Sequence, residues 1–388
     1  MDDGFQQMTR QNADQAKSTG TREARADEFL FWPFAGARLV LDTWLNLFGE
    51  SREPPEEADT PLSWTTPHSI ALELATVRLR DFSTKASGLP VVVCAPYALH
   101  GALLTDFAPA HSIVQALQQG GVGRLFVTDW RSATPDMRYL SIDSYLADLN
   151  AAVDTIGSPI DLIGLCQGGW LSLLFAGRFP EKVRRLVLVG APVDVSHQSP
   201  LSQMVASVPP RAFDALVDPA TGLFRGKHLL PAWSASLNSS AEDALQRSLA
   251  DEIDGADTLR QRFERWDDAP LDLPGTYYVE VADWIFRENR IAEGRFVALG
   301  RVIDPSRITL PLFLLVGRED RVVPAEQALA TAQLLGTPPD DVQVAIEPCG
   351  HLGLLMGRET MLHAWRRIAD WLSSEVPLSD QTSAERAA

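Results

Sequence analysis

Short apolar runs rich in valine, isoleucine and leucine recur along the chain between its polar segments. The runs are "PVVVCAP", "RLFVTDW", "IDLIGLC", "RRLVLVGAP", "LPLFLLVG" and "DVQVAIEP". Apolar and polar positions do not alternate within them, which is typical of strands buried on both faces of a sheet. Stretches with helical spacing of apolar residues separate several runs, at 107–120, 141–156 and 168–179. This alternation predicts a doubly wound, mostly parallel α/β sheet.

The strand pattern stops after the fourth of these runs and resumes at Leu310. The intervening segment has mostly helical or irregular signals, and a segment of that length inside a compact domain normally has its own structure. We therefore expect the core to be built from two parts, 62–193 and 308–375. Residues 194–307 are expected to form an inserted, mostly helical cap over the carboxyl ends of the strands.

The two ends of the chain differ in composition from its middle. Residues 1–27 and 376–388 are polar and poor in aromatic side chains, and we expect both to be disordered tails. Residues 28–61 are predicted to form an amphipathic helix followed by an acidic linker. The apolar residues at helical spacing are Ala37, Leu41, Trp44, Leu45 and Phe48. Such a helix either packs on the main domain or binds an apolar particle or a partner helix.

Charge and composition narrow the choice of partner and compartment. The formal net charge is -17 and the pI is near 4.8, which weighs against nucleic acids and anionic membranes because these attract clustered Lys and Arg. The N-terminus lacks the basic start and the apolar core of a secretory signal. The apolar run at 29–48 contains Pro33, Arg38 and Asp42, which a spanning helix rarely tolerates together. We expect no transmembrane segment and place the protein in the cytoplasm.

A cysteine lies at the centre of a glycine-framed turn between a predicted strand and a predicted helix. Gly164-Leu165-Cys166-Gln167-Gly168 has the form G-x-C-x-G, in the context that a nucleophile elbow requires. The two glycines allow a sharp turn and a close approach of strand and helix. The turn lifts the thiol toward the cleft, where the helix N-terminus favours a thiolate. A buried structural cysteine needs no such frame, so the sequence predicts that Cys166 is a covalent nucleophile.

A nucleophile in an elbow needs a histidine base and a carboxylate that orients it, in the chain order nucleophile, acid, base. His351 follows the final apolar run on a glycine-containing loop. Asp320 follows the preceding run, and Asp194 is the competing acid after an earlier one. We favour Asp320 because an acid after the penultimate strand is the commoner arrangement of this triad.

Backbone N–H groups next to the nucleophile are expected to stabilise an oxyanion. The donors we predict are Gln167 and, in the loop after "VVVCAP", Tyr97 or Ala98. The other two cysteines, Cys94 and Cys349, are expected to be packing residues. The three cysteines have no metal-ligand spacing, which indicates a reducing compartment and no bound metal.

Blocks of sequence on both sides of the elbow are shared with a known family. They are "YALHGALLTDFAPAHSIVQALQQGG", "TDWRSATPDMRYLSIDSY", "LIGLCQGGWLSLLFAGRFPEKV", "RENRIAEGRFVALGRVIDPSRI", "REDRVVP" and "CGHLG". From about residue 88 to 372 the chain resembles the polyhydroxyalkanoate synthases, especially the short forms that work with a partner subunit. The resemblance implies an α/β-hydrolase fold and catalytic roles for Cys166, Asp320 and His351. It also implies 3-hydroxyacyl-CoA or a polyester chain as substrate, no cofactor, and a partner subunit, a second copy or a polyhydroxyalkanoate granule surface as partner.

The chemistry of a cysteine thioester favours acyl transfer, because a thioester stays activated for attack by an alcohol. Our first hypothesis is therefore synthase-like polymerisation. The second is a depolymerase or thioesterase, since "DLPGTYYVEVADWIF" is similar to the intracellular polyhydroxyalkanoate depolymerases. Synthases commonly carry Ile-Asn-Lys or Ile-Asn-Arg where this chain has "HGA" at 100–102, and a histidine where it has Arg321. A third hypothesis is a weakly catalytic protein that binds granules.

Overall fold

The computed structural model describes one part of the chain, residues 62–374, with short internal gaps. The gaps are 198, 208, 210–212, 231–232, 234–236, 238, 251 and 255–256. The two predicted tails and the predicted amphipathic helix and linker lie outside the described residues. Within the described part, no helix is long and apolar enough to cross a membrane.

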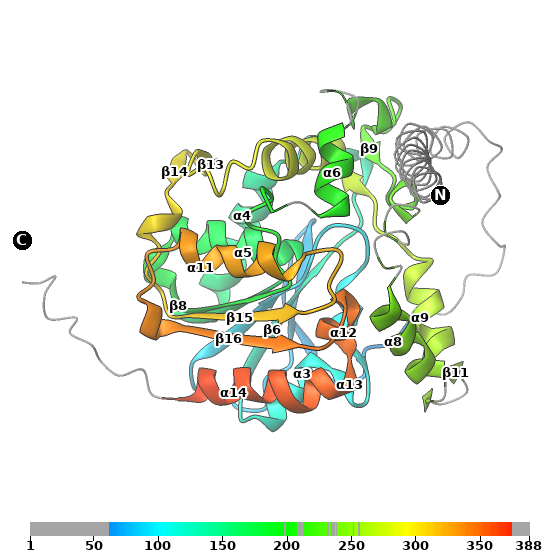
Figure 1. Cartoon of the computed structure of the whole chain (residues 1–388), viewed down its shortest axis with the longest axis vertical. Coiled ribbons are helices and arrows are strands. Elements are labelled where there is room, and N and C mark those ends of the chain that lie inside the picture. Colours follow the sequence, from blue (N-terminus) through cyan, green and yellow to red (C-terminus); the bar gives the residue numbers. More distant parts are fainter. Residues whose placement is uncertain are drawn as a thin grey trace, which may run out of the picture. The chain divides into compact units, whose positions relative to one another are not determined.

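An eight-stranded sheet forms the centre of the described part, in the order β1-β2-β6-β3-β7-β8-β15-β16 (Figure 1). All pairs from β6 to β16 are parallel, whereas β1 with β2 and β2 with β6 are antiparallel pairs. The strands are β1 Ser69–Glu73, β2 Val77–Asp81, β3 Pro90–Cys94, β6 Arg124–Trp130, β7 Ile160–Leu165, β8 Val183–Val189, β15 Leu312–Gly317 and β16 Val342–Glu347. The mostly parallel sheet predicted from the apolar runs is confirmed.

The parallel strands coincide with the apolar runs of the sequence. In β3, β7 and β15 every residue is buried, as expected where helices cover both faces of a sheet. The antiparallel strands β1 and β2 were not predicted. Several of their residues are partly or fully exposed, so their sequences contain polar side chains and form no continuous apolar run.

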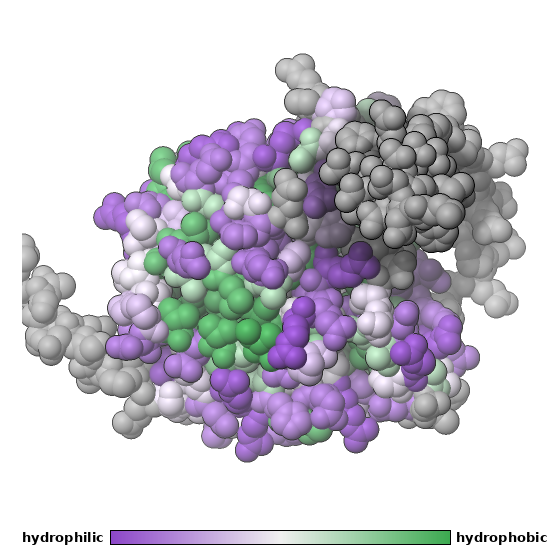
Figure 2. Space-filling view, in the orientation of Figure 1, coloured by the Kyte–Doolittle hydropathy of each residue, from purple (hydrophilic) through white to green (hydrophobic). Residues whose placement is uncertain are grey.

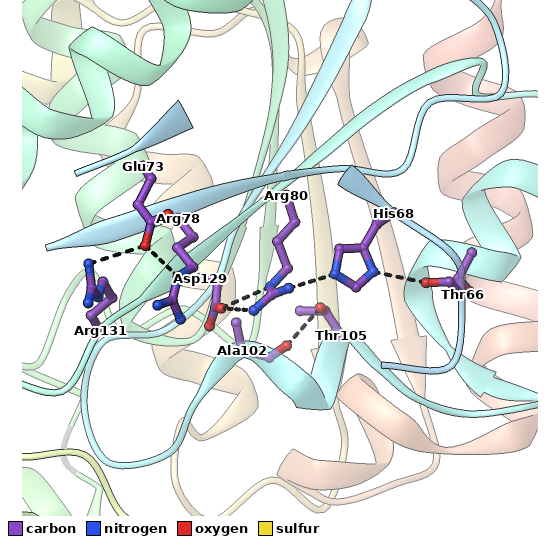
Figure 3. A network of polar contacts seen from close by, with 9 residues as sticks. All are labelled: Thr66, His68, Glu73, Arg78, Arg80, Ala102, Thr105, Asp129 and Arg131. Carbon is purple, nitrogen blue, oxygen red and sulfur yellow. Dashed lines mark hydrogen bonds and ion pairs between the residues drawn. The ribbon is translucent and has the colours of Figure 1, made fainter. Parts of the chain in front are cut away.

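A chain of polar contacts fastens this antiparallel edge to the parallel strands (Figure 3). Arg80 of β2 donates from Nε and Nη2 to Asp129 Oδ2 of β6, at 2.9 and 2.6 Å. Its Nη1 donates to His68 Nε2 at 2.6 Å, and His68 Nδ1 lies 3.0 Å from the Thr66 carbonyl oxygen. The guanidinium also lies 4.5 Å from the Trp64 ring. His68 accepts on Nε2 and donates from Nδ1, so one arginine ties the segment before β1 to the sheet.

Helices cover both faces of the sheet (Figure 1). α3 and α14 lie on one face, and α4, α5 and α11 lie on the other. The core helices are α3 Ile113–Gln119, α4 Ile142–Ile156, α5 Gln167–Arg178, α11 Ala325–Leu334, α12 His351–Met356, α13 Arg358–Thr360 and α14 Arg366–Ser373. Single 3-10 turns are η1 Ala102–Thr105, η2 Pro135–Met137, η3 Pro180–Lys182, η7 Pro305–Arg307 and η8 Pro339–Asp341, and η9 Met361–Trp365 is a π-helix. The predicted doubly wound arrangement is therefore confirmed.

The helix predicted at 107–120 is wrong in its first turns. Residues 106–112 instead form two short paired strands, β4 Asp106–Ala108 and β5 His111–Ser112, joined through Ala110 at a φ of 65°. The helix begins only at Ile113, because the Ser112 hydroxyl accepts the N–H of Gln115 and caps it there.

The segment between β8 and β15 contains the cap, and its helices are longer than its strands. The helical elements are α6 Pro200–Ser207, η4 Phe213–Leu216, η5 Gly226–His228, α8 Ser240–Ala250, α9 Leu259–Asp267, α10 Gly275–Glu280 and the π-helix η6 Val281–Arg287. The strands are β9 Leu223–Phe224, β10 Ile253–Asp254, β11 Asp257–Thr258, β12 Leu273–Pro274, β13 Phe296–Ala298 and β14 Arg301–Ile303. The prediction of an inserted, mostly helical cap is confirmed.

The last strand of the sheet, β16, leaves one edge open. Its side chains Val344 and Ile346 are exposed, and Figure 2 shows apolar side chains gathered over the region of β15 and β16. Among the described residues, no strand pairs along the outer side of β16.

Candidate active site

The turn from β7 into α5 holds Cys166 in an unusual backbone conformation. Cys166 follows the last residue of β7 and precedes the first residue of α5, with φ 48° and ψ -119°. A non-glycine residue in such a region costs about 1–3 kcal/mol and persists only where its surroundings hold it. A Cβ on Gly168 would overlap the Cys94 carbonyl oxygen, and a Cβ on Gly164 would lie 2.5 Å from the Gly169 Cα. Both glycines therefore permit the close packing of α5 against β3 and β7 that maintains this turn.

The second part of the site is a buried pair of His351 and Asp320. His351, the first residue of α12, is 1% exposed, and Asp320, in the turn after β15, is 5% exposed. The distance from His351 Nδ1 to Asp320 Oδ2 is 2.7 Å. Asp320 Oδ1 accepts the backbone N–H groups of Val322 and Val323, each at 2.8 Å. The carboxylate is thus fixed on one oxygen and free to orient the imidazole with the other.

The electrostatics of this pair affect the thiol as well. Burial opposes a charge on His351, but the Asp320 carboxylate and the Cys166 thiol raise the pKa of His351 well above its usual value. Nδ1 faces a carboxylate and therefore carries a proton, whereas Nε2 has no hydrogen-bond partner in the described part of the chain. The missing hydrogen bond at Nε2 is compatible with a catalytic role, because contacts between base and nucleophile are often long in enzymes without bound substrate. The Nε2 atom is accordingly the nitrogen available to take a proton from Cys166, which is itself 9% exposed.

The competing acid, Asp194, lies in a different environment. Its Oδ1 accepts the side-chain amide of Asn289 at 2.8 Å and the backbone N–H of Ser196 at 3.0 Å. Of the two acids weighed from the sequence, Asp320 is the one that contacts His351. Asp194 instead helps to hold Asn289, whose φ is 48°, beside Val195 in the segment that follows β8.

The loop after β3 is held by tyrosines from two other elements. Tyr277 of α10 donates its hydroxyl to the Tyr97 carbonyl oxygen at 3.1 Å, and Tyr145 of α4 donates to the Tyr97 hydroxyl at 3.0 Å. Among the described residues, none accepts a hydrogen bond from the backbone N–H of Tyr97, Ala98 or Gln167. These N–H groups therefore remain available as oxyanion donors. Sequence reasoning missed Tyr145 and Tyr277, because neither belongs to the motif that they support.

The other two cysteines lie in environments that suppress reactivity. Cys94 is fully buried in β3, and burial raises its pKa to about 12. Burial likewise raises the pKa of Cys349 to about 12. Near pH 8 a thiol with that pKa is ionised in roughly one molecule in ten thousand. Neither residue is therefore a ready nucleophile.

Brief treatment with iodoacetamide near pH 8 should label Cys166 ahead of Cys94 and Cys349. The thiolate is the reactive form, and Cys166 is the cysteine that adjoins an imidazole. Peptide mass spectrometry over a time course measures the three rates. Protein unfolded in urea serves as the control, because there the three rates should converge. Equal labelling of all three cysteines in the folded protein would contradict this assignment.

These features define the class of α/β-hydrolase-fold proteins. They are a mostly parallel sheet, a helical cap, a cysteine in the elbow, and an acid–histidine pair that follows later strands. Comparison with known families agrees. The sequence profile of the family described as "alpha/beta hydrolase fold" matches residues 98–357, and the chain belongs to this family.

The chain is also similar to several proteins named poly(3-hydroxyalkanoate) polymerase subunit PhaC. It is 26% identical to the one from Synechocystis over 345 residues, which cover 84% of this chain and 88% of that protein. It is 24% identical to the one from Haloferax mediterranei over 336 residues, 79% of this chain but 64% of that longer protein. The relative from Allochromatium vinosum is 26% identical over 293 residues, 73% of this chain and 81% of that protein. The resemblance to polyhydroxyalkanoate synthases is confirmed.

Solved structures agree on the fold. A thermophilic esterase from Thermogutta terrifontis aligns with a TM-score of 0.51 at 16% identity, covering 80% of this chain and 100% of the esterase. An enol-lactonase from Burkholderia xenovorans aligns with a TM-score of 0.50 at 14% identity, covering 79% of this chain and 100% of the lactonase. At such identities the similarity shows the shared fold alone.

Proposed function

We propose that this protein is an acyltransferase that forms a thioester on Cys166 and polymerises 3-hydroxyacyl groups from 3-hydroxyacyl-CoA, as a polyhydroxyalkanoate synthase does. The observation that carries the proposal is the placement of Cys166 in the elbow. The Cys166 thiol is close enough to raise the pKa of His351, and Asp320 orients the His351 imidazole. The names of the relatives from Synechocystis and Allochromatium supply the substrate class. The proposal needs no cofactor, because the CoA thioester is the activated substrate.

In the first half of the reaction, His351 Nε2 takes the proton of the Cys166 thiol and the sulfur attacks the carbonyl carbon of the CoA thioester. The carbonyl oxygen becomes an oxyanion, which the N–H of Gln167 and that of Tyr97 or Ala98 stabilise. The intermediate then collapses by breaking the bond to the CoA sulfur. His351 returns the proton to CoA, and the acyl group remains on Cys166 as a thioester.

In the second half, the hydroxyl end of a growing chain attacks the Cys166 thioester. His351 Nε2 takes the hydroxyl proton, an ester bond forms, and the bond between the acyl carbon and the Cys166 sulfur breaks. His351 then passes the proton to the departing sulfur, which restores the Cys166 thiol. A serine in the elbow would hold the acyl group as an oxygen ester. The cysteine thioester is close in energy to the CoA donor, so it remains activated for transfer to an alcohol.

Hydrolysis is the second candidate function, since water can replace the chain hydroxyl at the same step. Two sequence features favour it, namely "HGA" at 100–102 and Arg321 in place of the residues that synthases commonly carry. In the structure His100 Nε2 lies 3.1 Å from Asp267 Oδ1, and its ring is 4.2 Å from that of Trp266. This histidine thus packs against cap helix α9. Exclusion of water by the cap would decide between the two acceptors.

A product assay separates these functions. Purified full-length protein would receive 3-hydroxybutyryl-CoA with a 3-hydroxybutyrate oligomer as primer and, separately, amorphous polymer. We expect release of CoA together with lengthening of the primer, followed by mass spectrometry. Free 3-hydroxybutyrate with no lengthened primer, or release of acid from the polymer, would instead support a thioesterase or depolymerase. No turnover of either substrate would support the granule-binding hypothesis, in which the predicted helix within 28–61 binds the granule surface.

We also propose that the protein works with a second polypeptide chain. The family resemblance favours a partner subunit or a second copy of the chain, and the relatives are themselves named as polymerase subunits. The product assay should therefore be run over a range of protein concentrations, because activity that depends on a second copy rises more than in proportion to concentration.

A further inference from the structure

A carboxylate from the cap is buried beside the histidine loop. Glu242 lies in the first turn of α8, yet its side chain is 6% exposed. Its Oε1 accepts the backbone N–H of Leu352 at 2.9 Å, across 110 residues of sequence. Its Oε2 is buried and has no hydrogen-bond partner among the described residues. An acid with so few hydrogen-bond partners in such a place is costly, because burial removes its hydration.

The loop before α12 is shaped to receive this carboxylate. A Cβ at Gly350 would overlap Glu242 Oε1, so the residue that precedes His351 leaves room for the carboxylate only as a glycine. The carboxylate therefore packs against the backbone on one side of His351 and accepts a hydrogen bond from the residue on the other side. This fit joins a cap helix to the backbone that carries the imidazole.

Among the described residues, no Lys or Arg forms an ion pair with Glu242, and the nearest favourable charge is that of His351. Burial raises the pKa of Glu242 to about 7, while the Leu352 N–H and the nearby His351 lower it and Asp320 raises it. Cys349 is the further titratable neighbour in this loop. Burial disfavours the charged carboxylate at this place, and the Leu352 N–H and His351 offset that cost only in part.

We infer that Glu242 is a positioning residue for His351, which it serves by fixing the backbone at Leu352 and so coupling cap helix α8 to the base. The inference rests on the proposed function. Asp320 holds the imidazole ring from the core, and Glu242 holds the adjacent backbone from the cap. A cap that is out of place would remove one of these two restraints, and the base would lose its alignment with Cys166.

The test compares three variants. Glu242→Ala removes the acceptor, Glu242→Gln keeps an oxygen that can accept the Leu352 N–H, and Asp243→Ala changes an exposed acid one residue further along the same helix. With 3-hydroxybutyryl-CoA, we expect Glu242→Ala to lower kcat by about 10²-fold with little change in KM, because small misplacements of catalytic groups have effects of that size. Glu242→Gln should restore most of kcat, and Asp243→Ala should match the unchanged protein.

Amide hydrogen exchange of the peptide that contains Leu352 gives a second readout that needs no turnover. Exchange should be faster in Glu242→Ala than in the unchanged protein, and close to normal in Glu242→Gln and Asp243→Ala. Unchanged exchange in Glu242→Ala would overturn the inference whatever the protein's activity. Faster exchange with an unaltered kcat would also overturn it. If the unchanged protein turns over no substrate while exchange follows the expected order, the proposed function fails and the contact made by Glu242 stands.

Discussion

Replacing Cys166 by alanine should abolish turnover of 3-hydroxybutyryl-CoA, with a loss of at least about 10⁴-fold, while the fold stays intact. Removing the nucleophile of an acyl-transfer triad has effects of this order, because the residual groups act only through binding and the oxyanion donors. The substitution removes one atom from a side chain that is nearly buried, and alanine avoids the bulk of the thiol at a residue with a φ of 48°. Steady-state CoA release and a thermal melt measure the two parts of this expectation.

The matched control is Cys349→Ala, which removes a second thiol near the site. Cys349 lies two residues before His351 and contacts the Thr360 hydroxyl oxygen at 3.9 Å. We expect it to retain turnover within a few-fold, since its thiol has no role in the proposed chemistry. A Cys166→Ala variant that still releases CoA at the normal rate would show that Cys166 is not the nucleophile. Loss of activity in the Cys349 variant alone would transfer the nucleophile's role to that residue.

Asp320→Asn should lower kcat by about 10⁴-fold, through the tautomer of His351. The two backbone N–H groups of Val322 and Val323 hold one oxygen of the side chain, so an asparagine there would turn its amide NH₂ toward His351 Nδ1. A donor in that position forces Nδ1 to accept and moves the ring proton to Nε2. The Nε2 atom can then no longer take a proton from Cys166, and wrong-tautomer variants of such triads lose about four orders of magnitude.

Asp194→Asn is the control for this second prediction. Asp194 contacts Asn289 and Ser196 in the segment that follows β8, so its replacement should lower the melting temperature while kcat stays within a few-fold of normal. Single-turnover measurements with 3-hydroxybutyryl-CoA isolate the chemical step for both variants. A larger loss of rate in Asp194→Asn than in Asp320→Asn would show that the acid is assigned to the wrong residue.

The core and the elbow could be predicted because each depends on local rules. The parallel strands β3, β7 and β15 are buried along their whole length, and their sequences are therefore continuous apolar runs. The G-x-C-x-G motif can be recognised in the sequence because both of its glycines are required. A side chain at Gly164 or Gly168 would overlap neighbouring backbone atoms. Asp320 and His351 could be proposed because the strands preceding them are identifiable and the triad has a fixed chain order. In each case the residues that determine the local structure lie close together in the sequence.

The contacts that cap residues make with the active-site loops could not be predicted, because they join segments that are distant in the sequence. Glu242 reaches the histidine loop across 110 residues, and Tyr277 reaches Tyr97 across 180 residues. Glu242 belongs to no motif, and although Tyr277 lies in the block "DLPGTYYVEVADWIF", nothing in that block indicates a contact with Tyr97. The helix error at 107–120 has a local cause. Apolar spacing continues through that stretch, but Ala110 turns the chain before the helix begins.

The central claim, an acyl thioester on Cys166, is tested most directly by trapping that intermediate. Full-length protein would be mixed with 3-hydroxybutyryl-CoA without primer, quenched in acid after a short interval and digested for mass spectrometry. We expect a mass increase of one 3-hydroxybutyryl group on the peptide that contains Cys166, removed by hydroxylamine and absent from the Cys166→Ala variant. Turnover of the substrate with that peptide unmodified at every interval, or with the acyl group on another residue, would contradict it.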